Sequence, residues 1–321
     1  MGTEAHDGAP RVPAAPTAPM AAASGRHPPL AIAGLLFNAF AWGVSWWPFR
    51  ELGERALHPL WATALIYVLG VAIITVARPG AWGQLLRAPA LWWLLLASGL
   101  TNATFNWGVT IGDVVRVVLL FYLMPVWAVL LARALLGEAL TPGALVRLGL
   151  ALAGAAIVMW PESKPAVDAA DAAGIALPVP ATLAEWLGLA GGFAFALTNV
   201  LLRREAAQPE MARALAMFIG GALVAGALAL GLGTAGRIPW PGPAGGWALG
   251  VALLALWFLA SNLTLQYGAA RVPANVTAVV MVSEVLFASV SAVLLGASTI
   301  TPALVAGACL IVTASLLAAR A

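Results

Sequence analysis

The chain has 321 residues, of which 62% are hydrophobic and only 9% are charged. Soluble domains carry about 25% charged residues, so this composition excludes an ordinary soluble domain and indicates a polytopic membrane protein. The net charge is +3, and the basic residues are spread over the predicted loops without an aromatic–basic patch, so we expect no nucleic-acid partner.

Ten apolar runs of roughly membrane-spanning length follow an N-terminal segment of 28 residues. That segment is rich in Ala and Pro, which is typical of a disordered cytoplasmic tail (1–28) and not of a cleaved signal peptide. The apolar runs lie near residues 30–49, 57–77, 90–111, 115–135, 142–160, 183–202, 211–232, 246–268, 275–295 and 302–319. We therefore predict an all-α protein with ten transmembrane helices, in which the charged, Pro-containing stretch 161–181 links two sets of five.

The distribution of Arg and Lys predicts the orientation of the chain. If the N-terminus is inside, eleven of the sixteen basic residues fall in cytoplasmic segments and five fall outside. We therefore predict a multi-pass protein of the cell (inner) membrane, with both termini in the cytoplasm and the 161–181 linker on the extracytoplasmic side.

A polar pattern occurs twice, 160 residues apart. The segment LTNATFNWGV, which begins at residue 100, aligns with ASNLTLQYGA, which begins at residue 260, so Asn102 falls on Asn262 and Asn106 on Gln266. Because each half holds five helices, an odd number, the second half enters the membrane from the opposite side. This predicts an inverted-topology repeat, which in secondary transporters forms a substrate site near the bilayer midplane.

Four short motifs occur in order along the predicted helices. They are Trp42-Gly43-Val44-Ser45, Pro125-Val126-Trp127-Ala128, Leu136-Gly137-Glu138 and Leu202-Arg203-Arg204. Together they resemble the drug/metabolite transporter superfamily of the EamA type. The resemblance implies two five-helix EamA repeats, at 29–160 and 182–321, and a cavity lined by helices 1, 3, 4, 6, 8 and 9. It also implies a permease that exports or exchanges small metabolites.

The second half departs from this pattern in the ninth predicted helix. Pro125 should kink the fourth helix, because proline removes a backbone donor. Val285 stands at the aligned position of the ninth helix, so we expect that helix to bend less. Ala297-Ser298 stands where Gly137-Glu138 would fall, and Glu284 is an added acidic residue.

Glu284 is the only acidic residue near the centre of a predicted span. A charged side chain there costs about 2.5–3.5 kcal/mol on insertion scales. We therefore expect Glu284 to face a cavity or a partner, or to take up a proton, which makes it the candidate for proton coupling. Two other interpretations stay open: an ionised Glu284 that binds a substrate ammonium group, and a protonated Glu284 that only packs against a neighbouring helix.

The candidate cavity residues combine the repeated polar pairs with aromatic side chains. Each polar pair is spaced by four residues and so lies on one helix face. The alternative role for these amides is hydrogen bonding between helices, worth about 0.6 kcal/mol each. Asn38, a lone polar residue in the first helix, is expected to be structural. The predicted substrate-binding set is Trp42, Asn102, Asn106, Tyr122, Asn262, Gln266 and Glu284.

We expect a secondary transporter of small organic metabolites, an exporter or exchanger of amino acids or similar amphipathic compounds that works by alternating access. The alternatives are a carrier for quaternary amines, nucleosides or drugs, and a non-transporting membrane scaffold. No hydrolase, metal or phosphate-binding motif is present, so we expect no enzyme activity, no cofactor and no metal. The expected partners are the substrate, the lipid bilayer and a coupling proton. The sequence does not decide the oligomeric state, for which a homodimer is one option.

Overall fold

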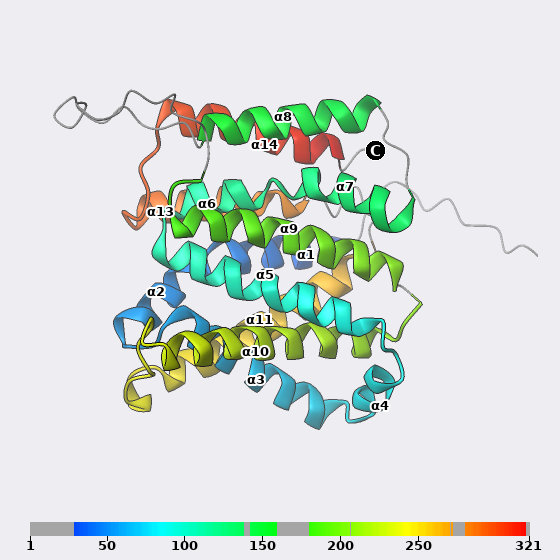
Figure 1. The fold of residues 1–321 in the computed structure, drawn as a ribbon, viewed down its shortest axis with the longest axis vertical. Coiled ribbons are helices and arrows are strands. Elements are labelled where there is room, and N and C mark those ends of the chain that lie inside the picture. The colour runs from blue at the N-terminus through cyan, green and yellow to red at the C-terminus, as the bar shows by residue number, and fades with distance from the viewer. Residues whose placement is uncertain are drawn as a thin grey trace, which may run out of the picture.

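The computed structural model describes residues 29–137, 142–158, 180–205, 207–269, 271 and 280–318, and the regular elements in these residues are all helices (Figure 1). In chain order they are α1 (Pro29–Gly43), α2 (Trp46–Glu54), α3 (Pro59–Ala77), α4 (Gly80–Leu86), α5 (Leu91–Ile111), α6 (Val114–Phe121), α7 (Met124–Leu136), α8 (Pro142–Val158), α9 (Leu183–Arg204), α10 (Glu210–Thr234), the 3-10 turn η2 (Ala244–Gly246), α11 (Ala248–Ala269), α13 (Ser283–Leu294) and α14 (Pro302–Ala318).

Six helical stretches in the described residues are long and apolar enough to cross a membrane. They are Pro29–Glu54, Pro59–Ala77, Val114–Leu135, Leu183–Leu202, Glu210–Thr234 and Ala248–Leu265. Three further apolar helices, α8, α13 and α14, are shorter. The helix α5 has 21 residues but lies outside this set, because its Asn and Thr residues lower its hydropathy. The prediction of an all-α polytopic membrane protein is thus confirmed, whereas the count of ten spans stays a prediction.

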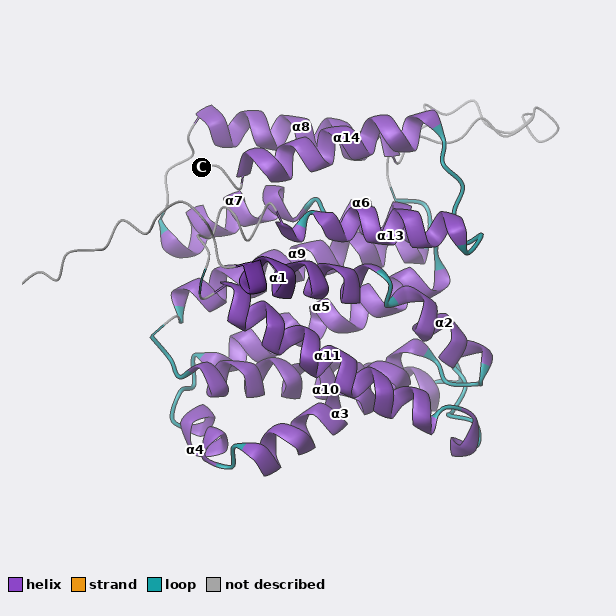
Figure 2. Cartoon of the chain, turned by 180° about the vertical axis from the view of Figure 1, so that it is seen from behind, coloured by secondary structure: helices purple, strands orange, loops and turns teal. Residues whose placement is uncertain are grey.

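The helices lie side by side in a stack, with the α8–α14 pair at one end and α3 at the other (Figure 1). The helix α4 and the C-terminal end of α14 lie on one side of this stack, and α2 lies on the opposite side together with the loop 235–247 (Figure 2). We call these the α4 side and the α2 side. The helix α5 runs from the α4 side to the α2 side, so the position of a residue along it gives its depth.

Two helices are interrupted near the middle of the stack. The predicted fourth helix is divided into α6 and α7 at Tyr122-Leu123, just before Pro125, whose nitrogen has no hydrogen to donate to the Phe121 carbonyl. The ninth is interrupted at Val282, although no proline follows it. The ninth helix is therefore not straighter than the fourth, contrary to the expectation from the missing proline, because a second cause interrupts it.

That second cause is a change of hydrogen-bond partner at the start of α13. The Val285 N–H donates to the Val282 carbonyl at 3.1 Å, and so does not close the usual helical bond to Met281. The hydroxyl of Tyr122 lies 3.0 Å from the Met281 carbonyl oxygen instead. A side chain at the α6–α7 interruption thus satisfies the backbone at the α13 interruption, and the two breaks lie next to each other.

Close backbone contact joins α5 to α10. A methyl group added at Gly99 would overlap the Gly220 carbonyl oxygen, and one added at Gly220 would overlap the Leu95 carbonyl oxygen. Glycine at such crossings lets helix backbones approach in a membrane. This contact fixes one wall of the interior.

Candidate functional site

A cavity of about 120 Å³ lies in the interior of the stack. A water needs about 10–15 Å³ of such space, so the cavity has room for several waters or a small organic molecule. Its lining comes from α1, α3, α5, α6, α9, α10, α11 and α13, and α8 and α14 contribute nothing to it. The polar lining residues are Asn38, Tyr67, Ser98, Thr101, Asn102, Thr198, Asn262 and Glu284, and the others are Trp42, Phe105, Phe121, Phe195, Met217, Phe218, Phe258, Leu265 and Met281.

Four of the seven residues predicted from the sequence line this one cavity. Trp42 and Asn102 come from the first half of the chain, and Asn262 and Glu284 come from the second. The side chain of Gln266 lies outside the described residues. The cavity therefore draws its polar groups from both halves.

The two remaining candidates lie outside the lining. Tyr122 is buried behind the lining, where its hydroxyl contacts the lining residues Glu284 and Met281. Asn106 has an exposed fraction of 0%, and its Nδ2 donates to Thr63 Oγ1 at 3.1 Å, between α5 and α3. Asn106 therefore acts in helix packing in this structure, which corrects its assignment to the cavity.

The rotation of α5 explains this correction. The cavity-facing residues of α5 are Ser98, Thr101, Asn102 and Phe105. At about 100° per residue, these four cover one arc in which Asn102 is at the edge, and Asn106 falls beyond that edge. Ser98 and Thr101 were not predicted, because the polar face of this helix was centred on Asn102 and Asn106. The polar residues Ser98, one turn before Asn102, and Thr101, directly before it, could have indicated the correct face.

The carboxylate of Glu284 is held at the junction of the two interrupted helices. Glu284 is 7% exposed, and its Oε2 lies 3.0 Å from the Tyr122 hydroxyl. That same hydroxyl lies 3.0 Å from the Met281 carbonyl. Glu284 is therefore buried yet has contact with the cavity, where a substrate or a proton can reach it.

The amides of the cavity are fixed by neighbouring helices. Asn38 on α1 donates its Nδ2 to the carbonyl and hydroxyl of Ser261 on α11, at 2.9 and 2.7 Å. Tyr67 on α3 donates its hydroxyl to Asn102 Oδ1, and Asn102 Nδ2 donates to the Ser98 carbonyl at 2.7 Å. Asn38 thus ties α1 to α11, as expected for a structural residue, and it also lines the cavity, which the sequence analysis did not expect.

Aromatic rings form much of the cavity wall. The ring centroids of Trp42 and Phe258 are 4.7 Å apart, and those of Phe105 and Phe121 are also 4.7 Å apart. Phe195 continues this wall, 5.2 Å from Phe121. Such a wall accommodates an apolar or aromatic body, and its ring faces attract cations.

The α2 side of the cavity is closed by buried apolar residues. Beyond Phe105, which lines the cavity, Val109 of α5 is 1% exposed and packs with Trp46, Val114 and Val118 in one cluster. The cavity-lining part of α5 lies before this cluster, towards the α4 side. The interior is thus closed on the α2 side.

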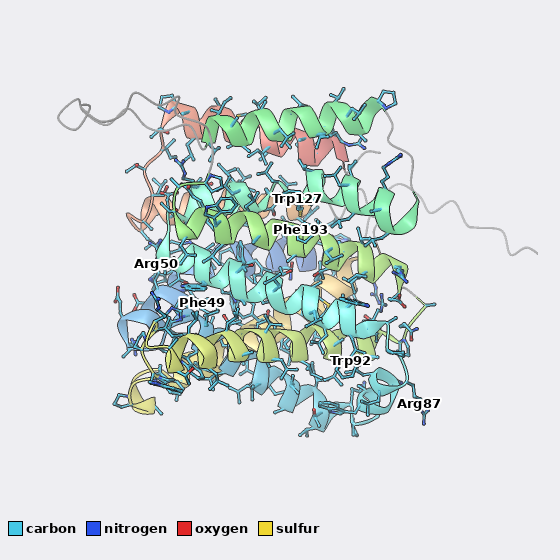
Figure 3. All side chains as sticks on the ribbon, viewed as in Figure 1. Phe49, Arg50, Arg87, Trp92, Trp127 and Phe193 are labelled. Carbon is cyan, nitrogen blue, oxygen red and sulfur yellow. The ribbon has the colours of Figure 1, made fainter. Side chains whose placement is uncertain are left out.

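Polar contacts between helices reinforce this closure. The guanidinium of Arg50 on α2 donates to the carbonyls of Thr110 and Gly112 at the end of α5, at 3.1 and 2.5 Å (Figure 3). Trp46 Nε1 donates to Ser291 Oγ on α13 at 2.9 Å. Arg116 on α6 forms an ion pair with the buried Glu185 on α9. Arg116 therefore pairs across helices.

A second hollow is larger but lies on the outer surface. It measures about 730 Å³ and lies between α1–α2 and α11, where Trp47, Leu249 and Leu253 are exposed. Exposed apolar residues on a membrane-spanning helix face lipid. We therefore take the interior cavity, with its buried polar groups, as the candidate site. Among the described residues, no group of three His, Cys, Asp or Glu side chains is placed to hold a metal ion.

Comparison with known proteins identifies the first half of the chain. Residues 29–160 match the sequence model of the EamA-like transporter family. The match confirms the resemblance to the EamA type of drug/metabolite transporter. Its bounds coincide with those predicted for the first repeat, although the match does not test the division of the chain into domains.

The structure also resembles known structures at the level of the fold. A solved structure titled "Crystal structure of protein" is similar over 91% of this chain and 99% of its own, with a TM-score of 0.53 and 20% sequence identity. No curated protein matches the sequence. The EamA-like half supplies Trp42 and Asn102 to the cavity, whereas Asn262 and Glu284 lie outside the matched segment.

Proposed function

We propose that this protein is a secondary transporter of small organic metabolites, which works by alternating access around the interior cavity. The observation that carries the proposal is the cavity itself, because both halves of the chain contribute buried polar side chains to one space. Transporters with inverted repeats bind substrate in this position, between the halves. A non-transporting scaffold has no use for a buried carboxylate and amides around an open space.

The pattern of helix contacts supports a ten-helix inverted repeat. The helix α5 packs on α9 and α10, and α11 packs on α1 and α3. If the two halves are exchanged, α5 maps to α11, α9 maps to α1 and α10 maps to α3. The contacts of α5 with α9 and α10 then become the contacts of α11 with α1 and α3. The pairs α3–α10 and α8–α14 map onto themselves. Two halves with equivalent contacts provide two equivalent end states, one open to each side.

The distribution of charge supports an inward-facing state. Arg78 and Arg87 flank α4, and Arg204 is the last residue of α9, so the α4 side is basic and is assigned to the cytoplasm. Beyond Phe105, the α2 side of the cavity is closed by buried apolar residues. On this assignment the C-terminus is cytoplasmic, and a reporter fused after Ala321 is expected to be active in the cytoplasm.

The chemistry of the cavity supports amphipathic substrates that carry an amine, a class that includes amino acids. Glu284 offers a counter-charge to an ammonium group, and the Trp42–Phe258 wall accommodates an apolar body. We further propose that a proton and the substrate compete for Glu284, so that entry of one accompanies exit of the other. A proton is abundant outside, which makes export the favoured direction.

Flux into and out of proteoliposomes tests the proposal. Purified protein would be reconstituted and loaded with a panel of amino acids, primary and quaternary amines, nucleosides and amphipathic drugs, and exchange of each would be measured by mass spectrometry against protein-free liposomes. We expect protein-dependent exchange of at least one amine-bearing compound. If no member of the panel moves, the proposal of transport by this cavity fails.

A further inference from the structure

The hydroxyl groups of Thr101, Thr198 and Tyr67 in the cavity donate their protons to other groups of the protein. Thr101 Oγ1 donates to Ala97 O at 2.8 Å, and Thr198 Oγ1 donates to Ala194 O at 2.9 Å. The Tyr67 hydroxyl donates to Asn102 Oδ1. Each hydroxyl oxygen keeps lone pairs after it has donated its proton, so these groups present acceptors to the cavity.

The amide and acid groups add further acceptors. Both N–H groups of Asn38 are used by Ser261, while its Oδ1 is buried and has no hydrogen-bond partner. The carboxylate of Glu284 has about four acceptor positions and, within the described residues, receives one side-chain contact, from Tyr122. The N–H groups left over on Asn102 and Trp42 are neutral, and no Lys, Arg or His lines the cavity within the described part of the chain.

This inventory predicts the charge of the ligand. A buried polar group without a partner costs about 1–3 kcal/mol, so a ligand is favoured if it brings donors to the acceptor positions of Glu284 that Tyr122 does not use. An ammonium group brings two or three N–H donors and a positive charge. A carboxylate brings only acceptors, and would enter beside Glu284 with no cationic side chain to balance it.

We infer that the cavity selects amphipathic monocations with a primary or secondary ammonium head over the zwitterionic amino acids that share the same body. The inference rests on the proposed function and narrows its substrate class. Glu284 supplies the counter-charge, and the wall of Trp42 and Phe258 holds the apolar body. Amino acids fit the body of the cavity and are disfavoured by their carboxylate.

A matched set of ligands tests the inference. Phenethylamine, phenylalanine and N,N,N-trimethylphenethylammonium share one ring and differ in the carboxylate or in the N–H donors. Equilibrium binding to purified protein in nanodiscs should give phenethylamine an affinity at least about tenfold above that of phenylalanine. The trimethyl compound keeps the charge and loses the donors, so it should bind more weakly than phenethylamine. Equal or tighter binding of phenylalanine overturns the inference.

Variants separate this inference from the proposed function. In Glu284→Gln, which keeps the shape of the side chain, the preference for amine over amino acid should fall towards one. The control Glu54→Gln removes an exposed acid at the end of α2 and should keep the full preference. If a correctly folded Glu284→Gln keeps the preference, the inference is wrong. If phenylalanine is exchanged faster than phenethylamine in proteoliposomes, the inference is wrong and the transport proposal stands. If neither is bound or moved, both are wrong for these compounds.

Discussion

The Tyr122 hydroxyl lies 3.0 Å from Glu284 Oε2 and also 3.0 Å from the Met281 carbonyl oxygen. A hydroxyl has one proton, so it can donate to only one of these acceptors at a time. With Glu284 protonated, its own proton can reach the Tyr122 oxygen, and Tyr122 can donate to Met281. With Glu284 ionised, the hydroxyl is drawn to the carboxylate and the Met281 carbonyl loses its partner. The state of Glu284 is thus linked to the interruption of the ninth helix.

This link predicts that Tyr122→Phe and Glu284→Gln are not additive. Residues that share a hydrogen bond show interaction energies of about 0.5–3 kcal/mol in double-mutant cycles. Exchange rates of the wild type, both single variants and the double variant would be compared in proteoliposomes. A parallel cycle that combines Tyr67→Phe with Glu284→Gln serves as the control, because Tyr67 lines the cavity and its hydroxyl donates to Asn102. Additive effects for Tyr122 and Glu284 would break the proposed link.

Asn102 and Asn106 should respond differently to alanine substitution. Asn102 lines the cavity, so Asn102→Ala should raise the apparent KM of an exchanged substrate. The side chain of Asn106 bonds only to Thr63 among the described residues, so Asn106→Ala should lower stability by about 1–3 kcal/mol and leave KM unchanged. Exchange kinetics and thermal melting in detergent measure both effects. If KM rose in Asn106→Ala and not in Asn102→Ala, the assignment of the cavity-facing side of α5 would be wrong.

Gly220 should tolerate no side chain. A methyl group there would overlap the Leu95 carbonyl, which belongs to the backbone of α5 and can move only with the helix. We expect Gly220→Ala to lower the free energy of unfolding by about 1–3 kcal/mol. The matched control is Gly231→Ala on the same helix, where nothing lies within 4 Å of the added methyl group. Alanine favours a helix by about 1 kcal/mol over glycine, so the control should be neutral or stabilising. Equal melting temperatures for the two variants would contradict the close crossing.

His58 should make stability depend on pH. It precedes α3 and lies just outside the apolar stretch Pro59–Ala77, and its Nδ1 accepts a hydrogen bond from the Leu60 N–H. Burial lowers the pKa of His58 from its ordinary value of 6.5. The unfolded chain therefore binds a proton at a higher pH than the folded one, so stability should be full above 6.5 and fall as the pH drops through the window below it. His58→Asn keeps a capping side chain that does not titrate and should remove this dependence in thermal melts. If the melting temperature of His58→Asn still depended on pH in this window, another group would be responsible for the dependence.

The sequence predicted the class of fold and part of the site, for identifiable physical reasons. The cost of charge in a membrane marked Glu284, and the repeated pattern marked Asn102 and Asn262, and all three line the cavity. The rotation of α5 is set by its contacts with α9 and α10, so the sequence could not separate the cavity-facing Asn102 from Asn106. Tyr67 lies in an apolar run that gave no sign of a polar neighbour, and the break at Val282 depends on Tyr122, 160 residues away. Such long-range contacts leave no local pattern.

The central claim is that substrate and proton share the cavity at Glu284. The most direct measurement is substrate flux driven by an imposed pH gradient in proteoliposomes that contain wild-type protein or Glu284→Gln, with equal reconstitution and matched melting temperatures. The account predicts that the wild type couples the gradient to substrate movement and that Glu284→Gln loses this coupling. Unchanged gradient-driven flux in correctly folded Glu284→Gln would contradict the account and leave Glu284 as a packing residue.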